Sequence, residues 1–184
     1  MSEDCCESSN QIGLYFPIEL FDEEAKTNTP DRIRRMMAEF KSWRDWNELE
    51  KGKGIFPAIS DDLIMVKNID FTSFCQHHAL PFSGKCSIAY LPSTHIVGLS
   101  KVARTVRKFA SRPQLQEYMT SQIADYLMTW IPNVKGVLVT VEAVHSCMVI
   151  RGARMTGITE SCAVRGAFKE NPSLKSETLE LLKK

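Results

Sequence analysis

Two short clusters of cysteine and histidine, far apart in the chain, constrain its fold more than any other feature. The first is Cys75-Gln-His-His78, and the second is His145-Ser-Cys147. A C-x-x-H spacing lets a thiolate and an imidazole reach one metal ion from a single turn, and zinc binds both ligand types tetrahedrally. If the second cluster supplies a third ligand, the fold must bring the clusters together while a fourth position stays open for water. That arrangement is typical of a catalytic zinc site, because protein ligands close all four positions of structural sites.

An inert structural role is the alternative for both clusters. A buried cysteine commonly packs as a small hydrophobe, and a single histidine is commonly a hydrogen-bonded core or surface residue. A C-x-x-H motif taken alone is compatible with either role. The same residue types recur beside two apolar, strand-like runs, which favours a metal site without deciding between the two.

The composition is that of an ordinary soluble globular protein with one domain, or with one domain and an extension. Of the 184 residues, 43% are apolar and 24% are charged, and the formal net charge is +1. This balance gives no support for a nucleic-acid or membrane partner held by bulk charge. The chain lacks a run as long as a transmembrane helix, and its acidic N-terminus lacks the apolar core of a signal peptide. We therefore expect a cytoplasmic protein with reduced thiols.

Hydrophobic periodicity predicts one helix, two strands, two helices, two or three strands and a final helix. The first helix is expected to begin at Thr29-Pro30-Asp31, with the threonine as N-cap and the proline at the first helical position. Residues 1–28 then form a short N-terminal tail, and residues 29–184 form the folded domain. The remaining predicted elements are strands at 63–69, 82–91, 135–151 and 158–164, and helices at 98–110, 113–130 and 172–182. This order indicates an α+β fold with a mostly antiparallel sheet and helices on one face.

Polar residues at two predicted helix starts are candidates for ligand binding. Ser100, Lys101 and Arg104 lie in the first turns of the 98–110 helix, where free backbone N–H groups and the helix dipole favour an anion. A solvated basic helix face is the alternative for this group. Gln116 and Glu117 lie near the start of the next helix. A carboxylate there can accept two N–H donors from a guanine-like edge, or it can simply favour the helix start.

In combination, these residues resemble the GTP cyclohydrolase I family from Thr29 to the C-terminal helix. The motifs that carry the resemblance follow the family's order and spacing. They are Phe74-Cys-Gln-His-His-Ala-Leu-Pro-Phe82, Gly98-Leu-Ser-Lys-Val-Ala-Arg104, Gln114-Leu-Gln-Glu117, Glu142-Ala-Val-His-Ser-Cys-Met-Val-Ile-Arg-Gly152 and Val164-Arg-Gly-Ala-Phe168.

The resemblance implies a tunnelling fold, in which antiparallel sheets from several subunits close into an oligomeric barrel. Members of the family are homo-oligomers, typically decamers of two stacked pentameric rings, with active sites between subunits. Closure of this kind also satisfies the edges that an open sheet leaves unpaired.

The resemblance also implies the chemistry, which converts GTP to 7,8-dihydroneopterin triphosphate and formate. Water activated by zinc attacks C8 of guanine, His77 protonates the ring nitrogen as the ring opens, and a second hydrolysis releases formate. The ribose then rearranges and recloses as a dihydropterin. The implied zinc ligands are Cys75, His78 and Cys147, and the residues tied to the ribose end are His145 and Ser100.

For the rest of the substrate, the resemblance assigns guanine recognition to Gln116 and Glu117. It assigns the triphosphate to three basic residues whose charge suits phosphate oxygens, Lys101, Arg104 and Arg151. The chain departs from the family at Gln76, where glutamate is usual beside the metal ligands. The product can enter folate, tetrahydropterin or deazaguanine biosynthesis.

Two alternatives to this activity are a non-catalytic, regulatory member that binds a pterin or nucleotide, and a related enzyme that acts on another purine or pterin. Retention of His77 and of all the implied zinc ligands argues against the first. The intact guanine and triphosphate residues favour GTP over another substrate.

Overall fold

The computed structural model describes residues 18–44 and 53–183, which belong to two compact units, Met1–Trp43 and Arg44–Lys184. In the first unit, the short 3-10 helix η1 (Ile18–Leu20) precedes the helix α2 (Glu23–Arg44). The predicted tail thus lies partly outside the described residues, and its separation from a domain at residue 29 stays a prediction.

Helix α2 begins six residues before the predicted start at Thr29. Asp22 directly precedes the helix, and its carboxylate oxygen accepts the backbone N–H of Ala25 at 2.7 Å. Asp22 is therefore the N-cap of the helix. Pro30 consequently lies inside the helix. The side chains of Glu24 and Arg32 bind each other across this proline, with N–O distances of 2.6 and 3.1 Å. The Thr-Pro-Asp signal was therefore wrong as a helix start, because an earlier aspartate provides the cap.

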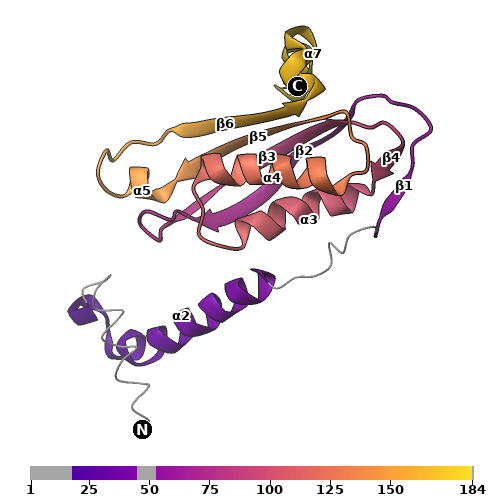
Figure 1. Ribbon diagram of the computed structural model, residues 1–184. Coiled ribbons are helices and arrows are strands. Elements are labelled where there is room, and N and C mark those ends of the chain that lie inside the picture. The colour runs from indigo at the N-terminus through magenta and orange to yellow at the C-terminus, as the bar shows by residue number, and fades with distance from the viewer. Residues whose placement is uncertain (1–17, 45–52, 184) are drawn as a thin grey trace. The chain divides into compact units, whose positions relative to one another are not determined.

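The second unit is built on a four-stranded antiparallel sheet in the order β2-β3-β5-β6 (Figure 1). Every neighbouring pair is antiparallel, which confirms the predicted α+β class with an antiparallel sheet. The strands alternate buried and exposed positions wherever one face is solvated. Their bounds are Ile64–Phe74 for β2, Pro81–Leu91 for β3, Gly136–His145 for β5 and Ile158–Gly166 for β6.

The pairing of β3 with β5 brings the second cysteine–histidine cluster beside the first. Phe82 is paired with His145, and Gly84 is paired with Ala143. A Cβ atom added to Gly84 would lie 1.8 Å from the carbonyl oxygen of Glu142 and 2.6 Å from the Cα atom of Ala143. Only glycine fits there, so this register depends on the absence of a side chain at residue 84.

Helices α3 (Leu99–Ala110) and α4 (Gln116–Trp130) lie across one face of the sheet (Figure 1). The main core lies beneath them and includes Ile88, Val106 and Ile123, all fully buried. The prediction that helices occupy one face is wrong for the C-terminal helices, α6 (Ala167–Glu170) and α7 (Pro172–Lys183). They pack against a second cluster, because Ala89 and Leu138 alternate with the main-core residues of their strands and face the opposite side.

Strand β5 ends at His145, whereas the sequence predicted a strand as far as residue 151. The next pair along the ladder would place Ser146 opposite Pro81, which has no backbone N–H to donate. The chain instead forms the short helix α5 (Ser146–Val149), and the backbone N–H of Ile150 donates to the carbonyl of Ser146 at 3.0 Å.

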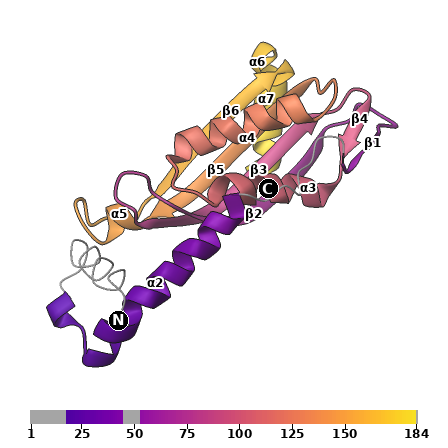
Figure 2. The same ribbon diagram turned by 60° about the horizontal axis from the view of Figure 1, so that its bottom comes forward.

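A small second sheet, which the sequence did not predict, lies at the other end of this unit. Its antiparallel strands are β1 (Ile55–Pro57) and β4 (His95–Val97), the latter just before α3. Figures 1 and 2 place this sheet and α5 at opposite ends of the main sheet. Across residues 18–44 and 53–183, no helix combines the length and apolar character needed to cross a membrane.

Candidate active site

Cys75 lies at the end of β2, where backbone hydrogen bonds fix it from two sides. Its N–H donates to the carbonyl of Leu80 at 2.8 Å, and its carbonyl accepts the N–H of Ala79 at 2.8 Å, which closes a tight turn. On the other side, residues 74 and 76 pair with the backbone of Gln114 in the loop before α4. Cys75 is 5% exposed, so its thiol is held at a buried position by the fold of the main chain.

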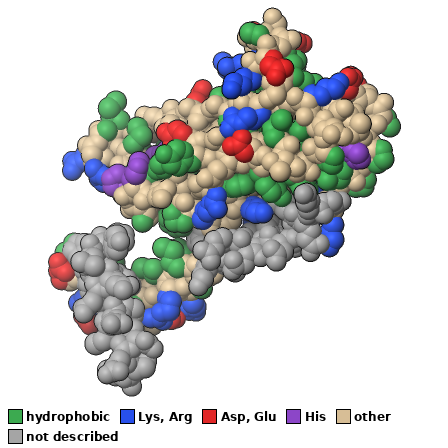
Figure 3. All heavy atoms as spheres, in the orientation of Figure 1, with side chains coloured by type: hydrophobic (Ala, Val, Ile, Leu, Met, Phe, Trp, Pro, Cys, Tyr) green, Lys and Arg blue, Asp and Glu red, His purple; other side chains and the backbone are tan. Residues whose placement is uncertain are grey.

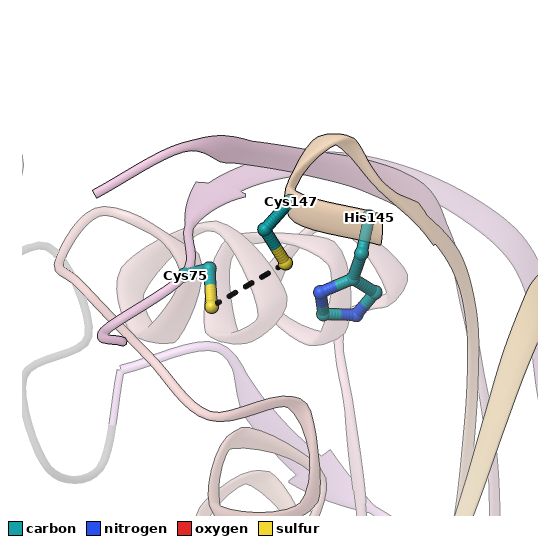
Figure 4. A group of neighbouring side chains, drawn as sticks. All are labelled: Cys75, His145 and Cys147. Carbon is teal, nitrogen blue, oxygen red and sulfur yellow. Dashed lines mark hydrogen bonds between the residues drawn. The ribbon is translucent and has the colours of Figure 1, made fainter. Parts of the chain in front are cut away.

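The sulfur of Cys75 meets the sulfur of Cys147 and the ring of His145 (Figure 4). The potential ligand atoms of these three residues lie within 4.8 Å of one another, and the two sulfurs are 4.0 Å apart. Two sulfurs bound to one tetrahedral zinc ion at about 2.3 Å would be about 3.8 Å apart. The separation of the two sulfurs and the donor types are therefore consistent with one bound metal ion.

Cys75 affects the ionisation of Cys147. Burial raises the pKa of the Cys147 thiol, and the neighbouring Cys75 raises it further. Two thiolates at this distance would repel each other unless a cation lay between them. A bound metal ion would supply that cation, so the two cysteines, deprotonated to thiolates, are suited to binding a metal.

His145 is held in a fixed orientation beside the thiols. Its ring stacks on Phe82 with a centroid separation of 4.4 Å and an interplanar angle of 7°. Its Nε2 atom lies 2.8 Å from Oε1 of Gln116. Burial lowers the pKa of His145, an effect that the charge of Glu117 opposes. The lowered pKa favours the neutral form of the ring, which can act as a ligand or a base.

His77 and His78 are exposed on the turn that follows Cys75, with ring centroids 6.2 Å apart. Nε2 of His78 makes a close hydrogen bond with the guanidinium of Arg151, which comes from the loop after α5. Figure 3 shows histidine and basic side chains together on the surface at this end of the sheet. Of the implied zinc ligands, the fold brings Cys75 and Cys147 together and gives them His145 as the nearby imidazole, while His78 faces Arg151.

Gln116 and Glu117 are adjacent in the sequence but contact different parts of the protein. Gln116 is 2% exposed, and its side-chain amide is bonded to β5, β6 and His145. Glu117 is exposed at a pocket of about 470 Å³ between α4 and β6, which it lines together with Ser161, Arg165 and Lys169. Sequence reasoning did not find the burial of Gln116, although helical periodicity could have: Gln116 lies three and seven residues before the buried Met119 and Ile123, on the same face of α4.

Ser100, Lys101 and Arg104 occupy the first turns of α3, as predicted, at the end of the helix that follows β4. The side chain of Lys101 lies close to Gly54, just before β1. Helix α3 has 12 residues and is therefore about 18 Å long. Its other end leads into the loop that pairs with Cys75. One chain therefore presents the thiols and these basic residues at separate places.

Comparisons with known proteins identify the family of this chain. The sequence model of the family described as GTP cyclohydrolase I matches residues 18–183. GTP cyclohydrolase 1 of Clostridium kluyveri is 45% identical over 163 residues, which cover 88% of each chain. Proteins of the same name from Finegoldia magna and Aquifex aeolicus are 42% and 43% identical, over 88% of this chain and 88% and 86% of theirs. The chain therefore belongs to the GTP cyclohydrolase I family.

Proposed function

We propose that the protein is a zinc-dependent GTP cyclohydrolase that converts GTP to 7,8-dihydroneopterin triphosphate and formate. The observation that supports this most directly is the pair of sulfurs 4.0 Å apart, with an imidazole beside them, in a chain of this family. Zinc held by Cys75, Cys147 and a histidine would act as a Lewis acid and make water a stronger nucleophile.

The remaining catalytic and binding roles are proposed for other residues of the site. His77 is exposed on the turn that carries Cys75, so it can transfer a proton to a ring nitrogen of a bound purine. Glu117 lines an open pocket with its carboxylate exposed, which suits recognition of the N–H groups of guanine. Ser100 and His145 are proposed to act at the ribose. Arg151 lies beside His78, where its guanidinium can bind phosphate oxygens.

We further propose that the active site is shared between subunits of a cytoplasmic homo-oligomer, with a decamer as the expected form. Lys101 and Arg104, assigned to the triphosphate, lie at the other end of α3 from Cys75 in the same chain. In the described part of the chain, β2 and β6 each pair with only one strand of the main sheet. Such edges can pair with other subunits and close a barrel of the tunnelling fold.

Incubation of the purified, zinc-loaded protein with GTP tests this function directly. Formate release and pterin fluorescence should appear at the same rate, and both should be lost when a chelator removes the metal and return when zinc is added. Formate without pterin would place the defect in the ribose chemistry. The absence of both products, with zinc bound and the oligomer intact, would contradict the proposal and favour a non-catalytic, nucleotide-binding member of the family.

A further inference from the structure

The amide of Gln116 is oriented by acceptors on two strands. Its Nε2 atom lies 3.0 Å from the carbonyl oxygen of Val141 in β5 and 2.9 Å from that of Thr159 in β6. A carbonyl oxygen can only accept a hydrogen bond, so both contacts require the NH₂ group of the amide. The reverse orientation would set three oxygen atoms against one another. The side-chain oxygen of Gln116 therefore has to face the opposite way, toward His145.

This orientation determines which nitrogen of His145 carries a proton. Oε1 of Gln116 has no hydrogen, and it lies 2.8 Å from Nε2 of His145, so Nε2 must be the donor of that hydrogen bond. A neutral imidazole has one N–H, which leaves an unshared electron pair on Nδ1. Figure 4 shows the other ring nitrogen directed toward the sulfur atoms of Cys75 and Cys147.

We propose that Gln116 is a positioning residue, which holds His145 as the Nε2–H tautomer and thereby directs the free electron pair of Nδ1 at the thiol pair. The use of this electron pair in catalysis rests on the proposed function, but the tautomer itself does not. The resemblance assigned Gln116 to guanine recognition. Both polar atoms of its amide instead have partners within the chain, and the side chain is 2% exposed.

Further contacts restrict movement of this hydrogen-bonded pair. The carbonyl of Gln116 accepts the hydroxyl of Thr120 at 2.7 Å, and that hydroxyl lies 2.7 Å from the hydroxyl of Ser161. The hydroxyl of Ser161 also lies 3.2 Å from the amide nitrogen of Gln116. Stacking on Phe82 fixes the plane of the His145 ring. Contacts within the chain thus hold both partners in place.

Solid-state ¹⁵N NMR of the metal-free, full-length protein with ¹⁵N-labelled histidine rings measures the tautomer directly. The signals of His145 are those lost in His145→Gln. They should show a protonated Nε2 and an unprotonated Nδ1 in the wild-type protein. In Gln116→Met, which keeps the length of the side chain but removes the acceptor, both tautomers should be populated.

The matched control is Gln114→Met. Gln114 is also buried just before α4, and its amide bonds the carbonyl of Phe109 and the side chain of Gln122 rather than His145. This variant should keep the Nε2–H tautomer. Gln116→Glu should also keep the Nε2–H tautomer of His145. A buried carboxyl group that takes up a proton has one donor for the backbone carbonyls and one acceptor for His145. A single Nε2–H tautomer in Gln116→Met, or an equal loss of it in Gln114→Met, would overturn the proposal.

Steady-state kinetics with GTP separate positioning from substrate recognition. Gln116→Met should lower kcat about 10–100-fold with little change in KM, because it removes a group that orients His145 without contacting the substrate. A rise in KM with unchanged kcat would instead return Gln116 to guanine recognition and contradict the inference. If the wild-type protein were inactive with GTP while its His145 showed the Nε2–H tautomer, the proposed function would fail and the positioning role of Gln116 would stand.

Discussion

At the scale of single residues, two histidines compete for the third position at the thiol pair. His78 lies on the same turn as Cys75, but its Nε2 faces Arg151. His145 has a ring nitrogen among the three candidate ligand atoms that lie within 4.8 Å of one another. The resemblance favours His78, whereas the geometry favours His145.

Metal content distinguishes the two histidines. If the geometry identifies the ligand, His145→Ala should lower the zinc bound per chain and weaken its affinity, because only the two thiols would remain, and His78→Ala should retain zinc. His77→Ala is the matched control, as its ring lies on the same turn and is assigned to proton transfer. Zinc analysis after dialysis against a weak chelator gives the result. Loss of zinc from His78→Ala alone would assign the position to His78.

The residue types of the site were evident in the sequence, but their spatial grouping was not. C-x-x-H spacing and the second cysteine predicted a metal site, and the structure places Cys75 and Cys147 together. The position of His145 depends on its pairing with Phe82 across two strands. Such a register is set by contacts between distant segments, which no local pattern records.

At the scale of secondary-structure elements, local signals predicted helix α3 almost to the residue. They were wrong about where α2 begins and where β5 ends. Helix α3 combines an apolar face with a clear start after Gly98. The overrun of β5 to residue 151 arose because Val149 and Ile150 continue an apolar, β-branched run. The strand ends at His145 for a reason that lies in another strand, since Pro81 cannot extend the ladder.

Gly84→Ala should destabilise the protein by at least about 1–3 kcal/mol, as expected for overpacking, because the added methyl group would overlap the backbone of β5. Gly157→Ala is the matched control, since a Cβ atom there has no neighbour within 4 Å. That change should stay within about 0.5 kcal/mol. Denaturant unfolding measures both variants. Equal stability of the two would mean that β3 and β5 separate at little cost, contrary to the close pairing described.

At the scale of the whole molecule, one chain provides the parts of a proposed site at two separate places. Both ends of the main sheet carry functional candidates, the thiols beside α5 and the basic residues at the start of α3. The sequence could not predict this separation, because it follows from the antiparallel path of β3 and α3 between the two ends. An α+β class could be predicted from the order of elements alone.

The length of α3 has a consequence for mixtures of defective chains. A chain with Cys147→Ala and a chain with Lys101→Ala and Arg104→Ala should each be inactive alone. When they are co-expressed, a neighbour's intact basic residues can complete the site of a chain that keeps its thiols. In a random one-to-one mixture, about a quarter of the sites should then be functional. The rate of GTP turnover in the mixed oligomer measures this complementation, which a site contained within one chain would not allow.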